Sequence, residues 1–259
     1  MALATLGCGA LLAWGWSLRD ELYWSAERGL GYSLGIVGLV CLVALLGYSV
    51  RKRHRSLRSA GALAPWFRIH MLLGILGPTA ILFHANFRLG SINSAVALIS
   101  MLGVAGSGYA GRFVYSRIHR GLFGERRVLA ELTRDAEEGF GAVDRVAEQV
   151  PELGAEFVGH ERWALERNPS VSASWRRFVA VRRRGRALER RAVAALRRAD
   201  RDPGRFLEAA LAEHLEALAR VAQFSAWERL FSLWHAIHLP LCVVLFAAAA
   251  VHVLAVHMF

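Results

Sequence analysis

Acidic residues are missing from two long parts of this chain, and this absence limits the folds that the chain can adopt. No Asp or Glu occurs between Glu27 and Glu125, and none follows Glu228. Both parts consist mainly of apolar runs of about 20 residues or more, the length that crosses a hydrocarbon core about 30 Å thick. All the acidic residues beyond Glu27 lie from Glu125 to Glu228. The sequence therefore predicts an all-α integral membrane bundle interrupted by one charged insertion.

The predicted domains follow this division of the chain. We expect an N-terminal apolar helix, three helices of a membrane core, a helical insertion and a last core helix, at residues 1–18, 30–115, 116–228 and 229–259. Within the core, the first three spans are predicted at residues 30–50, 65–87 and 94–115. The N-terminal helix is expected to be an extra span beside this four-helix core, with a re-entrant or interfacial position as the alternative.

Basic residues set the expected orientation. Five of the eight residues from Arg51 to Arg58 are Lys or Arg, and short loops rich in these residues stay in the cytoplasm. With five spans, the insertion is then cytoplasmic and the C-terminus lies outside. We therefore expect a multi-pass protein of the inner (plasma) membrane of the cell.

The insertion is predicted to be helical, and it carries no recognisable catalytic motif. Apolar residues recur there at spacings of three and four, which is typical of amphipathic helices. The expected helices cover residues 129–150, 152–167, 174–199 and a last segment that begins at Asp202 and Pro203. Residues 176–201 include eleven arginines. On a membrane protein such a run faces anionic lipid or an acidic partner, and no nucleic-acid partner is expected.

Two pairs of histidines lie in the expected core helices. His70 and His84 stand at positions i and i+14, and so do His238 and His252. On a helix, a step from i to i+14 returns to within about 40° of the starting direction and rises about 21 Å. Each helix would therefore present one imidazole near each side of the membrane, and neutral imidazole is a good axial ligand for haem iron. The pattern predicts two bis-histidine haem b sites, His70 with His238 near the cytoplasmic face and His84 with His252 near the outer face.

The other histidines and the cysteines are assigned different roles. His235 lies about 100° away from the face that carries His252, and His257 lies at the expected outer membrane edge, so both are predicted to be interfacial groups or neighbours of the ligands. Four histidines lie in polar regions and are predicted to be solvated: His54, His119, His160 and His214. The isolated cysteines form no Cys-x-x-Cys pair, so covalent haem attachment is not expected.

Small and basic residues near the ligand helices are candidates for contacts with haem. Glycines leave room for a flat macrocycle, and Gly35 and Gly106 represent the two glycine-rich core helices, although plain helix packing explains such glycines equally well. Arg68 and Arg88 flank the first ligand helix. We expect them to pair with anionic haem propionates, with snorkelling to lipid headgroups as an equal alternative.

These residues resemble the di-haem membrane cytochromes b. Two helices that each carry histidines at i and i+14, in a four-helix core, look like the cytochrome b subunit of quinol–cytochrome c oxidoreductases. The membrane domains of ferric reductases and NADPH oxidases have a similar layout. The resemblance covers about half of the chain and implies that the four paired histidines are axial ligands. The Pro-Glu-Trp-Tyr motif of the respiratory subunit is absent, as is the flavin and nicotinamide domain of the reductases.

The expected function is transmembrane electron transfer by a subunit of an oxidoreductase complex. Such a subunit would relay electrons between a quinol or cytoplasmic donor and a partner redox protein, surrounded by membrane lipid. Two alternatives remain open: a transporter that uses the histidines as a relay, and a scaffold that recruits a partner through the insertion. The lack of carboxylates in the main spans weighs against the transporter.

Overall fold

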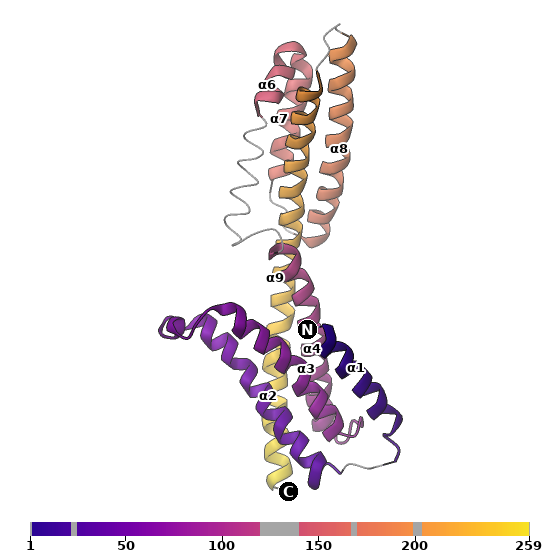
Figure 1. Cartoon of the computed structure of the whole chain (residues 1–259), viewed down its shortest axis with the longest axis vertical. Coiled ribbons are helices and arrows are strands. Elements are labelled where there is room, and N and C mark those ends of the chain that lie inside the picture. Colours follow the sequence, from indigo (N-terminus) through magenta and orange to yellow (C-terminus); the bar gives the residue numbers. More distant parts are fainter. Residues whose placement is uncertain (1, 22–24, 120–139, 167–169, 199–203, 259) are drawn as a thin grey trace. The chain divides into compact units, whose positions relative to one another are not determined.

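The computed structural model of the chain describes residues 2–21, 25–119, 140–166, 170–198 and 204–258. Every regular element in these ranges is a helix (Figure 1), and the β-type pairing found there is one isolated bridge between Ser25 and Arg28. The chain divides into two compact units. One contains residues 1–110 and 236–259, here called the membrane unit, and the other contains residues 111–235, here called the insertion unit.

Four helices in the described part of the chain are long and apolar enough to cross a membrane. They are α2 (Gly29–Arg53), α3 (Leu63–His84), α4 (Ile92–His119) and α9 (Gly204–Met258). Most of their side chains are exposed or only partly buried, and the exposed ones include large apolar residues such as Val40 at 60% and Val243 at 64%. Helices that remain apolar on their outer faces suit lipid rather than water. The structure therefore indicates a multi-pass membrane protein.

The predicted N-terminal helix is present as α1 (Ala2–Ser17). Its 16 residues are fewer than the roughly 20 that span a hydrocarbon core. It packs on α3, where Phe83 of α3 meets Gly15. A fifth crossing stays a prediction.

The four long helices share one apolar cluster in the membrane unit. Its buried residues are Leu42 of α2, Leu98 and Met101 of α4, and Leu245 of α9, and α3 adds Ile81 and Leu82 at its edge. This cluster brings together helices that are far apart in the sequence. The last core helix thus belongs with the first three although the whole charged insertion separates it from α4 in the sequence.

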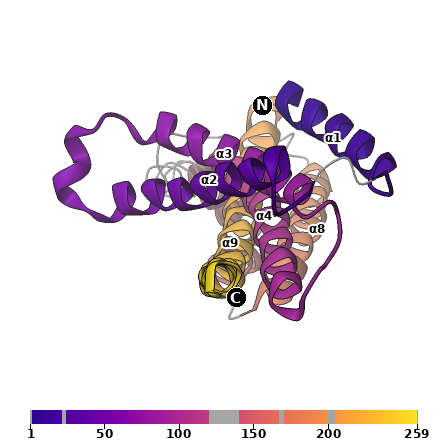
Figure 2. The same ribbon diagram turned by 90° about the horizontal axis from the view of Figure 1, so that it is seen from below.

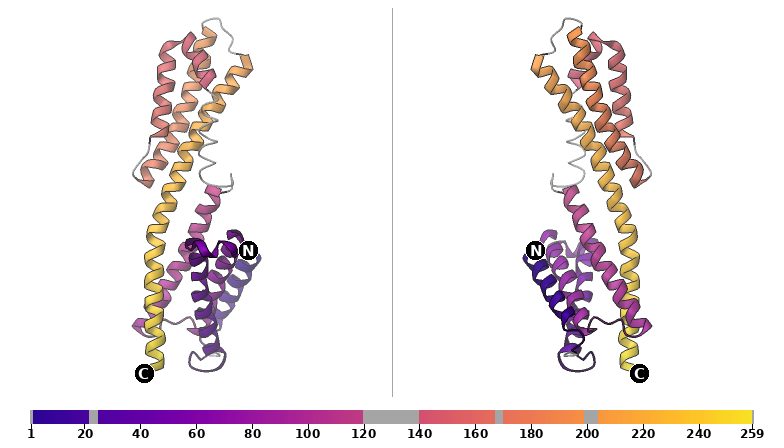
Figure 3. Two further views of the ribbon diagram at one scale, coloured as in Figure 1. Left: turned by 90° about the vertical axis from the view of Figure 1, so that its left-hand side faces the viewer. Right: turned by 90° about the vertical axis from the view of Figure 1, so that its right-hand side faces the viewer.

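Helices α2 and α3 form the closest pair in this unit and lie side by side (Figures 2 and 3). They are connected through the 3-10 helix η1 (Arg55–Ser59), and Arg51 closes the connection by donating to the Gly61 carbonyl at 2.7 Å. Glycines allow the close approach. A Cβ at Gly38 would lie 2.6 Å from the Ile81 side chain and 3.2 Å from the Gly77 carbonyl oxygen.

The insertion unit contains α6 (Phe140–Gln149), α7 (Pro151–Leu165), α8 (Val171–Arg198) and the first part of α9. Figure 3 shows α7, α8 and this part of α9 packed alongside one another. The helices predicted at 152–167 and 174–199 are confirmed within a few residues. Pro151 begins α7, as expected of a residue that fits the first helical turn. The start of the helix predicted at 129–150, and the pair Asp202 and Pro203, lie outside the described residues.

One feature of α9 differs from the prediction of separate elements. The last helix of the insertion and the last core helix are one continuous helix of 55 residues. No glycine or proline occurs in the stretch 205–239, so nothing in that stretch favours a break.

The substitution Gly38→Val tests the α2–α3 contact. We expect it to destabilise the protein by roughly 1–3 kcal/mol, because a side chain there overpacks the helix interface. The midpoint of thermal unfolding in detergent should fall by several degrees. The matched control is Gly74→Val on α3, where an added Cβ has its nearest neighbour at 4.0 Å. Equal midpoints for the two variants would contradict the close packing.

Candidate functional site

Both histidines of α3 form hydrogen bonds to the backbone of α2. His70 Nδ1 lies 3.1 Å from the Leu45 carbonyl oxygen, and its ring packs on Tyr48 with centroids 5.2 Å apart. His84 Nδ1 lies 2.9 Å from the Gly31 carbonyl oxygen. A carbonyl only accepts, so in each case Nδ1 carries the proton and Nε2 keeps its lone pair.

Both predicted ligands of α9 contact serines of α4. His238 Nδ1 lies 2.6 Å from the Ser107 hydroxyl oxygen, and His252 Nδ1 lies 3.5 Å from that of Ser94. Sequence reasoning missed both serines. Their signal was their position, because they stand at i and i+13 in a largely apolar helix.

The residues that bond to the four histidines have nearly the same spacing along their helices as the histidines have along theirs. On α2 the two accepting carbonyls belong to residues at i and i+14, and on α4 the two serines stand at i and i+13. Helix α3 and the C-terminal part of α9 run in the same direction (Figure 1). The imidazoles of His84 and His252 are also close enough to interact electrostatically. The hydrogen-bonded positions therefore repeat after about 20 Å along each helix pair.

The two remaining histidines of the last span behave differently. His235 Nδ1 bonds to the Phe231 carbonyl at 3.2 Å and His257 Nδ1 to the Val253 carbonyl at 2.8 Å. Each acceptor is four residues back on the same helix, and both side chains are exposed. The four predicted ligands are instead half-buried and bonded to a neighbouring helix.

Gly35 lies directly against one of the imidazoles. A Cβ at Gly35 would be 2.7 Å from His84 Nδ1, so only glycine lets the ring sit against α2 in this position. Gly106 differs, because a Cβ there would meet nothing within 4 Å. Gly35 and Gly38 of α2 thus serve the contact with α3, whereas Gly106 leaves the surface of α4 open.

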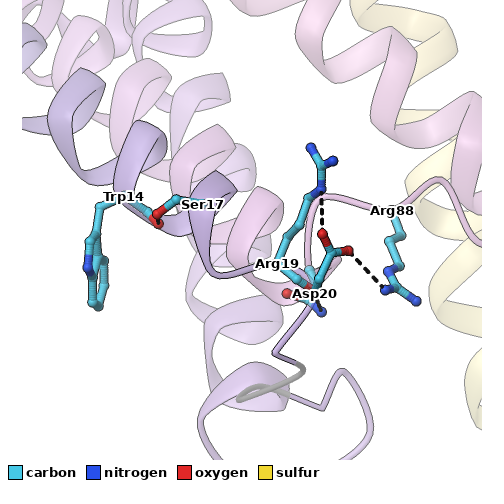
Figure 4. A network of polar contacts seen from close by, with 6 residues as sticks. Trp14, Ser17, Arg19, Asp20 and Arg88 are labelled. Carbon is cyan, nitrogen blue, oxygen red and sulfur yellow. Dashed lines mark hydrogen bonds and ion pairs between the residues drawn. The ribbon is translucent and has the colours of Figure 1, made fainter.

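Both arginines predicted to flank the first ligand helix are exposed, and Arg68 lies inside α3 while Arg88 follows it. Arg88 forms an ion pair with Asp20 at 3.6 Å, and Asp20 also pairs with Arg19 at 3.6 Å (Figure 4). The connection after α1 is fastened further by Asn86, which donates to the Arg19 carbonyl at 3.0 Å. A carboxylate therefore already occupies the neighbourhood of Arg88, and a contact with a propionate stays a prediction for both Arg68 and Arg88.

The number of metal-binding side chains near the four histidines limits which metal group they can bind. No group of three or more His, Cys, Asp or Glu side chains gathers among the described residues. A haem iron needs only two axial protein ligands, and metal-binding histidines usually donate their second ring N–H to a carbonyl or other acceptor. The residues present fit that requirement, because all four have Nδ1 engaged.

Comparison of the chain with protein-family models, with curated proteins and with solved structures found no match.

The prediction that His160 and His214 are solvated is wrong. Their exposed fractions are 6% and 1%. His160 of α7 lies between Phe157 and Ala164, which belong to the two apolar clusters of the insertion unit. A charged segment can still bury a histidine. Amphipathic helices with many arginines on one face pack their apolar face inward, and a histidine on that face is buried with it.

The environment of His160 keeps it neutral. Its Nε2 is buried and has no hydrogen-bond partner among the described residues, and the ring lies against Gly185 of α8, where a Cβ would be 3.5 Å from Nε2. Burial, with the nearby Arg184 guanidinium and His214 imidazole, lowers the pKa of His160 below its ordinary value of 6.5. These two groups, from α8 and α9, are the titratable groups that act on it.

Low pH should lower the free energy of unfolding of the insertion unit, because His160 must then take up a proton. The unfolded chain takes up a proton near pH 6.5 while the folded chain does so only at lower pH, so stability falls as pH drops below about 6.5. One such group contributes a slope of at most about 1.4 kcal/mol per pH unit. Hydrogen exchange of α7, compared at pH 7.5 and 5.5 after correction for intrinsic rates, measures this loss. His160→Leu should flatten the slope, whereas His54→Leu, at an exposed position, should retain it.

Proposed function

We propose that this chain is a di-haem membrane cytochrome b that carries electrons across the membrane. The observation that carries the proposal is the bonding of four intramembrane histidines. Each uses Nδ1 to contact a neighbouring helix, as histidines that bind a metal through Nε2 usually do. Polar groups within membrane spans are costly and usually functional.

The proposed ligand pairs are His70 with His238 and His84 with His252. The imidazoles of His84 and His252 are close enough to interact electrostatically, which supports the second pair. The first pair follows from the same offset, i to i+14, on both helices. Helix α3 and the end of α9 run in the same direction. If His84 and His252 lie at the same depth in the membrane, the histidines 14 residues earlier on each helix, His70 and His238, therefore also share a depth.

Two bis-histidine haems b would supply one-electron redox chemistry at two depths of the bilayer. The role of the chain is to hold the four imidazoles in one tautomer and orientation and to keep water away. Two of these histidines would hold each haem, so no substrate is expected to bind at the iron. The partners proposed are a quinol or a cytoplasmic donor and a further redox subunit. The insertion unit is proposed to be cytoplasmic, on the basic residues that follow α2.

The pyridine haemochrome spectrum of the purified protein is the first test. We expect about two haems b per chain. Replacement of any of the four histidines by alanine should remove about one haem, because each iron needs both axial ligands. The matched controls are His235→Ala and His257→Ala, which alter exposed histidines of the same helix and should retain two haems.

Double variants test the pairing itself. His70→Ala with His238→Ala should cost only one haem, whereas His70→Ala with His84→Ala should cost both. Absence of haem from the native protein would rule out the cytochrome and return the chain to the relay transporter or the scaffold. Loss of both haems by the first double variant would show that the pairs are assigned wrongly.

Gly35→Ala tests the placement of the imidazole of His84. The added Cβ would lie 2.7 Å from Nδ1, so the ring must move and its bond to the Gly31 carbonyl should weaken. We expect the electron paramagnetic resonance signal of one low-spin haem to shift, while that of the other stays. Gly47→Ala is the control, since its Cβ would make an ordinary contact of 3.6 Å with Trp66. Identical spectra for both variants would speak against His84 as a ligand.

A further inference from the structure

Some of the arginines of α8 are paired with carboxylates and others are not, a difference that the sequence does not show. Arg177, Arg191 and Arg197 each pair with a glutamate of the insertion unit, at 3.1, 2.6 and 2.8 Å. Arg176, Arg183 and Arg190 are exposed and form no ion pair with any described residue. We call these three the α8 arginine row.

The row is straight and long. Its members recur at every seventh position, so they drift only about 20° per step and extend over about 21 Å of helix surface. An open hollow of about 550 Å³ adjoins it, lined by Trp175, Arg176, Val179, Ala180, Arg183 and Arg184. The surface thus combines positive charge that no described carboxylate pairs with and a small apolar centre, as protein interfaces commonly do.

We propose that the α8 arginine row is the docking surface for an acidic soluble protein that exchanges electrons with the membrane unit. Charge complementarity carries this choice of partner. The internal glutamates neutralise the flanking arginines, and the row is left as a positive stripe that attracts a negative surface and speeds encounter. The identity of the partner as an electron carrier rests on the proposed function.

A lipid surface fits this row less well. Helices that lie in a membrane interface bury a wide face of large apolar side chains. On α8 the large apolar residues Val181, Leu188 and Leu196 are buried inside the insertion unit, and Val179 is the large apolar side chain exposed along the described helix. No apolar face of the described helix therefore remains for insertion between lipids.

Binding of flavodoxin, an acidic one-electron carrier, tests the proposal. The full-length protein is placed in phosphatidylcholine nanodiscs, and the dissociation constant is measured at 50 and 300 mM NaCl. We expect binding that weakens with salt. The triple variant R176Q/R183Q/R190Q should weaken it by about tenfold at low salt, because three exposed ion pairs are lost.

The matched control is R177Q/R191Q/R197Q, which removes the same three charges from the same helix. It should change the dissociation constant by no more than about twofold, since those charges are already neutralised. Equal weakening by the two variants would mean that only net charge matters and would overturn the row as a docking surface. So would absence of binding at 50 mM NaCl, or binding to mixed phosphatidylcholine and phosphatidylglycerol vesicles in place of flavodoxin.

The same preparations separate this proposal from the proposed function. Flavodoxin binding does not require haem, and the haem spectrum does not require flavodoxin. Two haems without binding would refute the row and leave the cytochrome intact. Binding without haem would keep the row as a site for an acidic protein and refute its role in electron exchange.

Discussion

An imidazole inside an apolar helix must find a partner for its N–H, because an unpaired buried donor costs about 1–3 kcal/mol. In this protein the need is met across helix interfaces. The two histidines of α3 bond to α2, and His238 and His252 of α9 bond to α4. Helices can meet at that distance only where side chains are small, which explains why Gly35 lies against an imidazole. The contacts that pair the four membrane helices are therefore the same contacts that place the four histidines.

Much of this could be read from the sequence, for a physical reason. Spans of apolar residues and a histidine spacing of i to i+14 are properties of a single helix, so the bounds of α2 and α3 were predicted within a few residues. The partners of the histidines depend on which helices meet. Nothing local marks the Gly31 carbonyl as an acceptor, and Ser94 looks like an ordinary residue near the start of a helix. The sequence likewise does not distinguish Arg176 from Arg177. They are neighbours in the chain, but only Arg177 forms an ion pair with Glu166.

The protein uses histidine in two contrasting environments. In the membrane unit the four proposed ligands are half-buried and bonded at Nδ1 to a neighbouring helix. In the insertion unit, His160 is enclosed by apolar clusters and its Nε2 lacks a described partner. The first arrangement orients a ring without hiding it, as a ligand requires. The second hides a ring and lowers its pKa, so its protonation competes with folding. Residue type alone does not distinguish these outcomes.

The acceptors on α2 and α4 differ in how they respond to genetic change. The Leu45 and Gly31 carbonyls belong to the backbone, and no point mutation can remove them. The Ser94 and Ser107 hydroxyls are side chains, and one nucleotide change in a codon can delete either. Variation within a lineage would thus leave the α3 half of each proposed pair constant and adjust the α9 half. Whatever property these imidazoles govern, α4 is the helix on which selection can tune it in small steps.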